Sequence, residues 1–194
     1  PQARLEDAPV GWGELLTRAW LPSLAMVSLA VWLHAANSMI TATLIDAMLD
    51  EIGALMNPGD ALLLGLDRVK DPGVLEAAYD DAAGVSAAFA RNLLTRLNRD
   101  LQGTFDPKQF AYQAVWQERQ QRIEMALVSR CEQSIELAGE TWHVQAGERL
   151  VTEHSLKYTP AAAAELAARS GWRIRQRWHD RDDSFSLHWL EPAD

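Results

Sequence analysis

Glu153 and Ser155 place a carboxylate and a hydroxyl two residues apart in the stretch VTEHSLKYTP, residues 151–160. The stretch begins as a strand, and Thr159-Pro160 is typical of a helix start. Because a strand alternates its faces, Glu153 and Ser155 are expected to point the same way. A carboxylate and a hydroxyl on one face can accept and orient the N–H groups of a polar ring.

Two further groups of side chains suit a binding site. They are Tyr79, Asp80, Asp81 and Gly84 in AYDDAAGVS, and Glu124 and Met125 in RIEMALVS. From residue types alone, each group also has an ordinary structural explanation. A solvated carboxylate, a core methionine or the surface of a helix would account for them, and both interpretations stay open at this point.

Several kinds of active site are excluded by the sequence. His154 lies between Glu153 and Ser155, but adjacent strand residues face opposite ways, so it cannot serve as the base of a triad. There is no GxGxxG, P-loop or HExxH motif. The five histidines are not at metal-ligand spacing, so we expect no metal site. The residues alone identify no catalytic or cofactor-binding side chain.

The composition is that of a globular protein. The chain has 194 residues, of which 48% are hydrophobic, and its formal net charge is -9. This acidic balance argues against a nucleic-acid partner. A single cysteine, Cys131, allows no disulfide within the chain and fits the cytoplasm. A monomer is the expected assembly.

The most hydrophobic run covers residues 19–36 and contains Pro22, Ser23, Ser28 and His34. A membrane-spanning helix needs about 20 predominantly apolar residues. We therefore expect a buried or amphipathic helix here, without a membrane partner.

Hydrophobic spacing predicts the order of the elements. Helices are expected at 12–36 with a kink at Pro22, at 41–56, at 73–101 with a break at Gly84, and at 160–170. The apolar run 61–67 predicts a fully buried strand of a parallel sheet, with Asp67, Arg68 and Lys70 at its carboxyl end, where ligands bind in open α/β sheets. Short alternating runs within 122–155 predict an antiparallel meander, and 172–180 and 185–192 predict two final strands.

Several long strings resemble one family in order. They are GDALLLGLDRVKDPGVLEAAYDDAAGVSAAFARNLLTRLNRDL, RIEMALVS, GERLVTEHSLKYTP and FSLHWL. From about Leu49 to Leu190, the chain resembles the carboxyl half of L-histidine N-alpha-methyltransferase. That enzyme uses S-adenosylmethionine to convert L-histidine into hercynine, on the way to ergothioneine.

The resemblance implies an α/β fold. The chain would form the carboxyl-terminal part of a class I (Rossmann-like) methyltransferase sheet, with an inserted α+β substrate-recognition region. Residues 45–68 and 158–194 would be the partial methyltransferase core, and 69–157 the substrate-recognition region. Residues 1–44 are unassigned and are expected to be mostly helical.

The resemblance also assigns substrate-binding residues. In the family, the TExS string grips the imidazole of histidine, which here means Glu153 and Ser155. The methionine of the IEM string, here Met125, lines the pocket, and the tyrosine of AAYDDA, here Tyr79, contacts the substrate carboxylate. Ser86 stands where the family has a threonine and keeps the hydroxyl. Relatives that prefer tryptophan would lack the glutamate, so Glu153 favours histidine.

The family's first half, which carries the S-adenosylmethionine site, has no counterpart in residues 1–44. A glycine-rich loop after a first strand is missing there. We therefore expect the chain to be an incomplete, poorly active or inactive portion of the enzyme. A fragment, a disturbed reading frame or a remodelled relative would each explain this. The alternative function is a non-catalytic imidazole-binding module, or a subunit completed by another chain.

Overall fold

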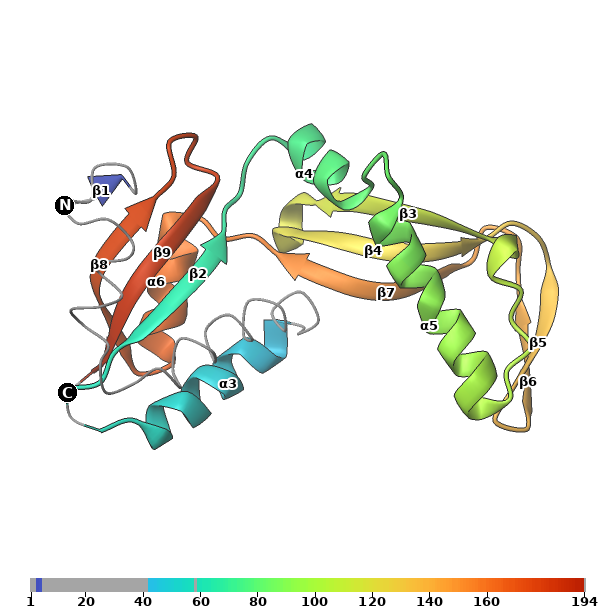
Figure 1. The fold of residues 1–194 in the computed structure, drawn as a ribbon, viewed down its shortest axis with the longest axis horizontal. Helices are drawn as coiled ribbons and strands as arrows, with labels where there is room; N and C mark the ends of the chain where they lie inside the picture. The colour runs from blue at the N-terminus through green and yellow to red at the C-terminus, as the bar shows by residue number, and fades with distance from the viewer. Residues whose placement is uncertain (1–2, 5–41, 58, 194) are drawn as a thin grey trace. The chain divides into compact units, whose positions relative to one another are not determined.

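The structure is a computed structural model that describes residues 3–4, 42–57 and 59–193 (Figure 1). The predicted kinked helix over 12–36 lies outside the described residues. The same is true of the hydrophobic run 19–36 and of nearly all of the segment 1–44. None of the helices in the described part of the chain combines the length and the apolar character that a membrane crossing requires.

The described chain divides into two compact units. Unit 1 comprises the described residues of 1–70 and 155–194, and unit 2 comprises 71–154. The boundaries expected from the sequence lie two and three residues from these divisions. The functional roles expected for the two regions stay predictions.

Unit 1 contains a four-stranded sheet with the strand order β1 (Ala3–Arg4), β8 (Trp172–His179), β9 (Phe185–Pro192) and β2 (Leu62–Asp67). β9 runs antiparallel to both β8 and β2, so β8 and β2 run in the same direction (Figure 1). The two final strands and the strand over 61–67 are confirmed. However, the described hydrogen-bonded partner of β2 is the antiparallel β9, and only Leu62 and Leu66 of β2 are buried.

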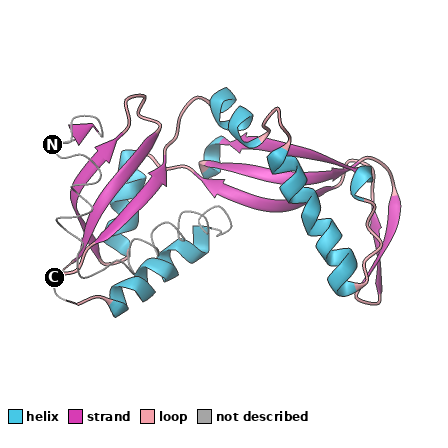
Figure 2. Ribbon diagram, viewed as in Figure 1, coloured by secondary structure: helices cyan, strands magenta, loops and turns pink. Residues whose placement is uncertain are grey.

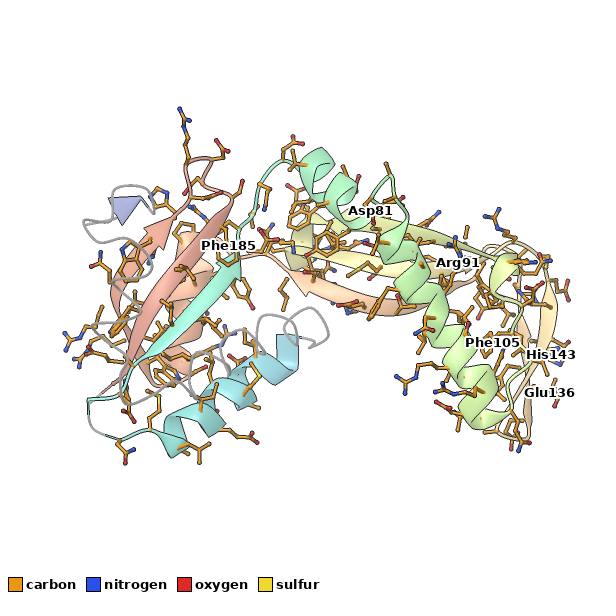
Figure 3. All side chains as sticks on the ribbon, in the orientation of Figure 1. Asp81, Arg91, Phe105, Glu136, His143 and Phe185 are labelled. Atoms are coloured by element: carbon orange, nitrogen blue, oxygen red, sulfur yellow. The ribbon has the colours of Figure 1, made fainter. Side chains whose placement is uncertain are left out.

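The loop between β8 and β9 explains why these two strands run antiparallel. The Asp180 carboxylate accepts hydrogen bonds from the N–H groups of Ser184 (2.6 Å) and Phe185 (3.0 Å). So short a connection returns the chain antiparallel to β8. Gly65 of β2 is required at this contact, because a Cβ there would lie 2.7 Å from the ring of Phe185, which is labelled in Figure 3.

In the described part of unit 1, helices α3 (Ala42–Leu55) and α6 (Pro160–Arg169) pack with this sheet and confirm the helices predicted at 41–56 and 160–170. The Thr159 hydroxyl caps α6 by accepting from the N–H of Ala162 (3.1 Å). Gly171, with a φ of 71°, ends it. The apolar faces of both helices share one core with the sheet: Ile45, Leu49, Ile52, Leu62, Leu66, Tyr158, Ala163, Leu166, Ala167, Trp172 and Leu190.

Unit 2 packs helices against a three-stranded sheet (Figure 2). The strand order is β3 (Phe110–Gln117), β4 (Arg122–Ser129) and β7 (Arg149–Leu156), whose last two residues belong to unit 1. The helices are α4 (Pro72–Tyr79) and α5 (Val85–Leu101), which confirm the predicted break at Gly84. Short 3-10 turns, η2 (Pro107–Gln109) and η3 (Glu118–Gln120), flank β3.

The predicted meander is only partly correct. β5 (Gln133–Leu137) and β6 (Glu140–Val144) pair with each other in a separate two-stranded sheet. The strands beside β4 are β7 and β3, and β3 was not predicted. β4 does alternate as expected, with Ile123, Met125 and Leu127 buried in the core beneath α5.

Candidate functional site

β7 carries both members of the predicted ring clamp. Glu153 and Ser155 lie at alternate positions within this strand, which ends at Leu156. Glu153 is partly exposed, whereas Ser155 is buried, with 6% of its surface accessible. Glu153 as a whole residue is therefore more exposed to solvent than Ser155.

Ser155 belongs to a charged cluster in unit 1 at the carboxyl end of β2. The Lys157 ammonium donates to the Ser155 hydroxyl oxygen over 2.7 Å and lies 2.9 Å from Asp67 Oδ2. Lys70 donates to Asp67 Oδ1 over 2.6 Å. The Lys157 side chain has no solvent exposure. A ligand was predicted to bind at this end of β2. Asp67 lies there between Lys70 and Lys157, and Lys157 also donates to Ser155.

A second cluster gathers around the Tyr112 phenol in unit 2. Tyr112 is a buried residue of β3, and its hydroxyl donates to the backbone carbonyl of Tyr79 over 2.9 Å. Burial raises the pKa of Tyr112 to about 12, and the negative charges of Asp80, Glu153 and Asp81 add to the effect. Tyr79 and Glu153, which are far apart in sequence, are thereby brought into the same electrostatic environment. Its negative potential suits a ligand that offers cationic or N–H groups.

Asp81 links this cluster to Ser86. Its carboxylate accepts hydrogen bonds from the backbone N–H groups of Ser86 (3.0 Å) and Val85 (3.1 Å) at the start of α5. Asp81 is labelled in Figure 3. These bonds, that from Ser86 first, lower the pKa of Asp81 to about 2. Ser86 is thus held at a helix terminus beside the Tyr112 cluster.

Met125 takes a different place. It is 5% exposed and lies in the hydrophobic core of unit 2. The hydroxyl of Thr152, on β7, donates to the Met125 carbonyl over 3.2 Å. The core position accounts for the methionine, and its predicted role in lining a pocket remains a prediction.

His154 has its partner on β4. Its Nε2 lies 3.2 Å from Glu124, which also pairs with Arg122 and Arg149, each at 3.2 Å. Burial by itself would raise the pKa of Glu124, but hydrogen bonds from His154 and Arg122 outweigh it, so the pKa lies below its usual value. His154 and Ser155 thus contact different groups, in agreement with the exclusion of a triad. Nowhere in the described residues do three or more His, Cys, Asp or Glu side chains form a group that could hold a metal ion.

Comparison with known proteins decides the family. Residues 31–192 match the family described as histidine-specific methyltransferase, SAM-dependent. The chain belongs to this family. The resemblance predicted from its sequence strings is confirmed, and so is the α/β methyltransferase fold class.

Two relatives of the chain agree with the family match. A histidine N-alpha-methyltransferase of Mycolicibacterium smegmatis is 40% identical over 161 residues, which cover 82% of this chain and 50% of that protein. One of Mycobacterium tuberculosis is 43% identical over 142 residues, or 72% and 44%. A solved S-adenosylmethionine-dependent methyltransferase of Clostridium acetobutylicum superposes with a TM-score of 0.40 at 8% identity, covering 82% of this chain and 55% of that one. The chain spans about half the length of the curated relatives.

Two residues of the candidate site were not predicted from the sequence. Tyr112 was missed because β3 was missed, although the alternation of FAYQAVW, residues 110–116, signals a strand. Lys157 stands two residues after Ser155, so extending the strand alternation by one step would have placed the two together.

Replacing Asp81 with alanine is expected to loosen the start of α5. The carboxylate holds two backbone N–H groups, so amide hydrogens of Val85 and Ser86 should exchange faster in the variant. Because the pKa of Asp81 is lowered from 3.8 to about 2, its contribution is complete above about pH 4 and is lost as the pH falls through about 2. Hydrogen exchange and carboxyl titration by NMR measure both effects. Asp100→Ala, near the other end of α5, is the control, and a pKa of Asp81 near 4 would contradict the assignment.

Proposed function

We propose that this chain carries the histidine-recognising portion of an S-adenosylmethionine-dependent histidine N-alpha-methyltransferase. The observation that carries the proposal is the family match over residues 31–192, combined with Glu153 and Ser155 at alternate positions of β7. The reaction would be an in-line displacement, in which the neutral α-amine of L-histidine takes the methyl group from the sulfonium.

Recognition of the imidazole is assigned to β7. The Glu153 carboxylate accepts the ring N–H, and the Ser155 hydroxyl bonds to the other ring nitrogen. A site built for such bonds rejects rings that leave its polar groups unpaired, by orders of magnitude. Met125 is proposed to line the pocket from β4.

The amino-acid end of the substrate is assigned to residues near Tyr112. The Tyr79 phenol is proposed to donate to the substrate carboxylate, with the Ser86 hydroxyl in a supporting role. The hydrogen bond from Tyr112 to the Tyr79 carbonyl supports this, since it fixes the backbone from which the Tyr79 side chain extends.

The described residues do not fit the methyl donor. A nucleoside-binding loop needs glycines between a strand and a helix, where the backbone must approach the ligand closely. In the described part of the chain, β2 leads into α4 through Arg68–Asp71, and β7 leads into α6 through Lys157–Thr159, and neither connection contains glycine. We therefore derive no step through S-adenosylmethionine. The proposal is an incomplete enzyme, or, as the alternative, a histidine-binding module or subunit completed by another chain.

The proposed setting is the biosynthesis of ergothioneine in the cytoplasm, with the chain as a monomer. The single cysteine supports a reducing compartment. The proposed product of the complete enzyme is hercynine, the trimethylated form of histidine.

Calorimetry with the purified chain tests the proposal. We expect saturable binding of L-histidine at pH 8, where the ring is neutral. L-Phenylalanine, which has no ring nitrogen, should bind at least about a hundredfold more weakly, because Glu153 and Ser155 would lose their partners. Equal binding of the two amino acids, or no binding of L-histidine, would disprove the proposed recognition.

A further inference from the structure

His188 is a buried residue of β9 that has no role in the proposed recognition of L-histidine. Only 1% of its surface is accessible. Its Nε2 lies 2.9 Å from the Ser186 hydroxyl oxygen, which in turn lies 3.3 Å from the carbonyl oxygen of Leu66 on β2. Its Nδ1 is buried and has no hydrogen-bond partner in the described part of the chain. Unpaired buried polar atoms are uncommon and costly in folded proteins, so a partner for Nδ1 is expected.

The residue opposite His188 in the sheet has the same deficiency. Arg177 on β8 pairs with His188 in the register of β8 and β9, so the two side chains leave the sheet on the same face. The Arg177 Nε is also buried without a hydrogen-bond partner, and none of the described carboxylates forms an ion pair with its guanidinium. Arg177 as a whole residue is partly exposed, so this pair is not sealed from solvent.

The charges around the His188 ring are positive. Burial lowers the pKa of His188 to about 4, and the positive charges of Arg177 and Arg68 act in the same direction. The imidazole is therefore neutral at neutral pH, between two guanidinium groups. A ligand that meets both His188 and Arg177 must be compatible with this positive potential.

The acidic groups nearby are already engaged. Asp183 is paired with Arg68, and the Asp180 carboxylate accepts hydrogen bonds from two backbone N–H groups. Burial is the main cause that lowers the pKa of Arg68, and repulsion by Arg177 ranks above attraction by Asp180. Arg177 is thus a cation whose counter-charge is not supplied by the described residues.

We propose that Arg177 and His188 form a binding site for an oxoanion group, a phosphate or a carboxylate, within unit 1. The Arg177 Nε–H donates to one oxygen of the anion, because the planar guanidinium suits such groups. A neutral imidazole carries its proton on either ring nitrogen. With the anion bound, the His188 proton lies on Nδ1 and is donated to the anion, while the Ser186 hydroxyl turns to donate to Nε2. Both unpaired atoms thereby gain a partner, independently of any recognition of histidine by β7.

NMR of the His188 ring nitrogens in the 194-residue chain tests the site. The chain is titrated with inorganic phosphate and, separately, with acetate, at constant ionic strength. We expect at least one of them to produce a saturable shift in which Nδ1 becomes the protonated nitrogen. The anion that binds more tightly identifies the ligand as a phosphate or a carboxylate. If neither anion shifts the ring nitrogens, the two atoms are not an oxoanion site and the proposal is overturned.

Substitution of Arg177 shows whether a specific contact or overall charge holds the anion. Arg177→Met should weaken binding by at least about tenfold, because a charge-assisted hydrogen bond is lost. Arg177→Lys keeps the charge without the planar fork, so its loss should be smaller. Arg181→Met removes the same charge from an exposed residue of the β8–β9 loop and is the control. An equal loss of affinity in Arg181→Met would overturn the assigned contact.

Thermal melting distinguishes a ligand site from a purely structural role of Arg177. Without phosphate or acetate, Arg177→Met should melt no lower than the wild-type chain, since methionine leaves no buried N–H unpaired. The anion that binds should raise the Tm of the wild-type chain but not that of the variant, because a ligand stabilises the folded state that binds it. A clear fall in the Tm of Arg177→Met in anion-free buffer would mean that the protein itself pairs Arg177, which contradicts the proposal.

Discussion

Glu153→Ala is expected to weaken L-histidine binding by about ten- to a hundredfold. A hydrogen bond to a charged group contributes about 1.5–3 kcal/mol, and in the variant the ring N–H loses its acceptor. The proposed function assigns this acceptor to Glu153 on β7. No change in affinity would show that the ring is held elsewhere.

Calorimetry at pH 8 measures this effect, and two variants calibrate it. Glu153→Gln keeps an oxygen acceptor without the charge, so its loss of affinity should be smaller than that of Glu153→Ala. Glu140→Ala removes an exposed carboxylate on the β6 strand of the same unit and should leave the affinity unchanged. An equal loss in Glu140→Ala would mean that overall charge, and not a contact with the ring, determines binding.

Elements whose signals are local were predictable from the sequence. The cap at Thr159, the break at Gly84 and the apolar spacing of 41–56 each act within a few residues, and the structure has helix boundaries there. Strand pairing depends on residues far apart, and here prediction was weaker. The antiparallel insertion of β9 between β8 and β2 joins segments more than 100 residues apart, and no local pattern encodes it.

The candidate site shows the same division. Glu153 and Ser155 were found because their spacing is short, whereas the contact of Lys157 with Asp67 spans 90 residues. Tyr112 reaches the carbonyl of Tyr79 across 33 residues. Each contact depends on which strands meet in the fold. The sequence therefore suggested groups that could face a ligand, a role that stays a prediction, but it did not show which side chains contact them.

The purified chain is expected to form hercynine at least about a thousandfold more slowly than a complete relative. Methyl transfer from a sulfonium depends on holding the two reactants in line, and correct positioning is worth many orders of magnitude in effective concentration. In the described residues, neither strand-to-helix connection, from β2 to α4 or from β7 to α6, offers a glycine-rich loop for the methyl donor. Mass spectrometry of reactions with L-histidine and S-adenosylmethionine measures the rate. The histidine N-alpha-methyltransferase of Mycolicibacterium smegmatis is the positive control.

A chimera tests whether the slow formation of hercynine is due to the lack of a site for the methyl donor. Joining the amino-terminal half of the Mycolicibacterium smegmatis relative to residues 45–194 of this chain supplies a donor site while keeping β7. The chimera should form hercynine, and Glu153→Ala within it should lower kcat/KM by at least about tenfold, because the ring loses its acceptor. Rapid turnover by the 194-residue chain alone would refute its incompleteness. If the chimera forms hercynine and Glu153→Ala does not slow it, substrate recognition lies outside β7. The incompleteness of the chain and the recognition of histidine by β7 can therefore be refuted separately.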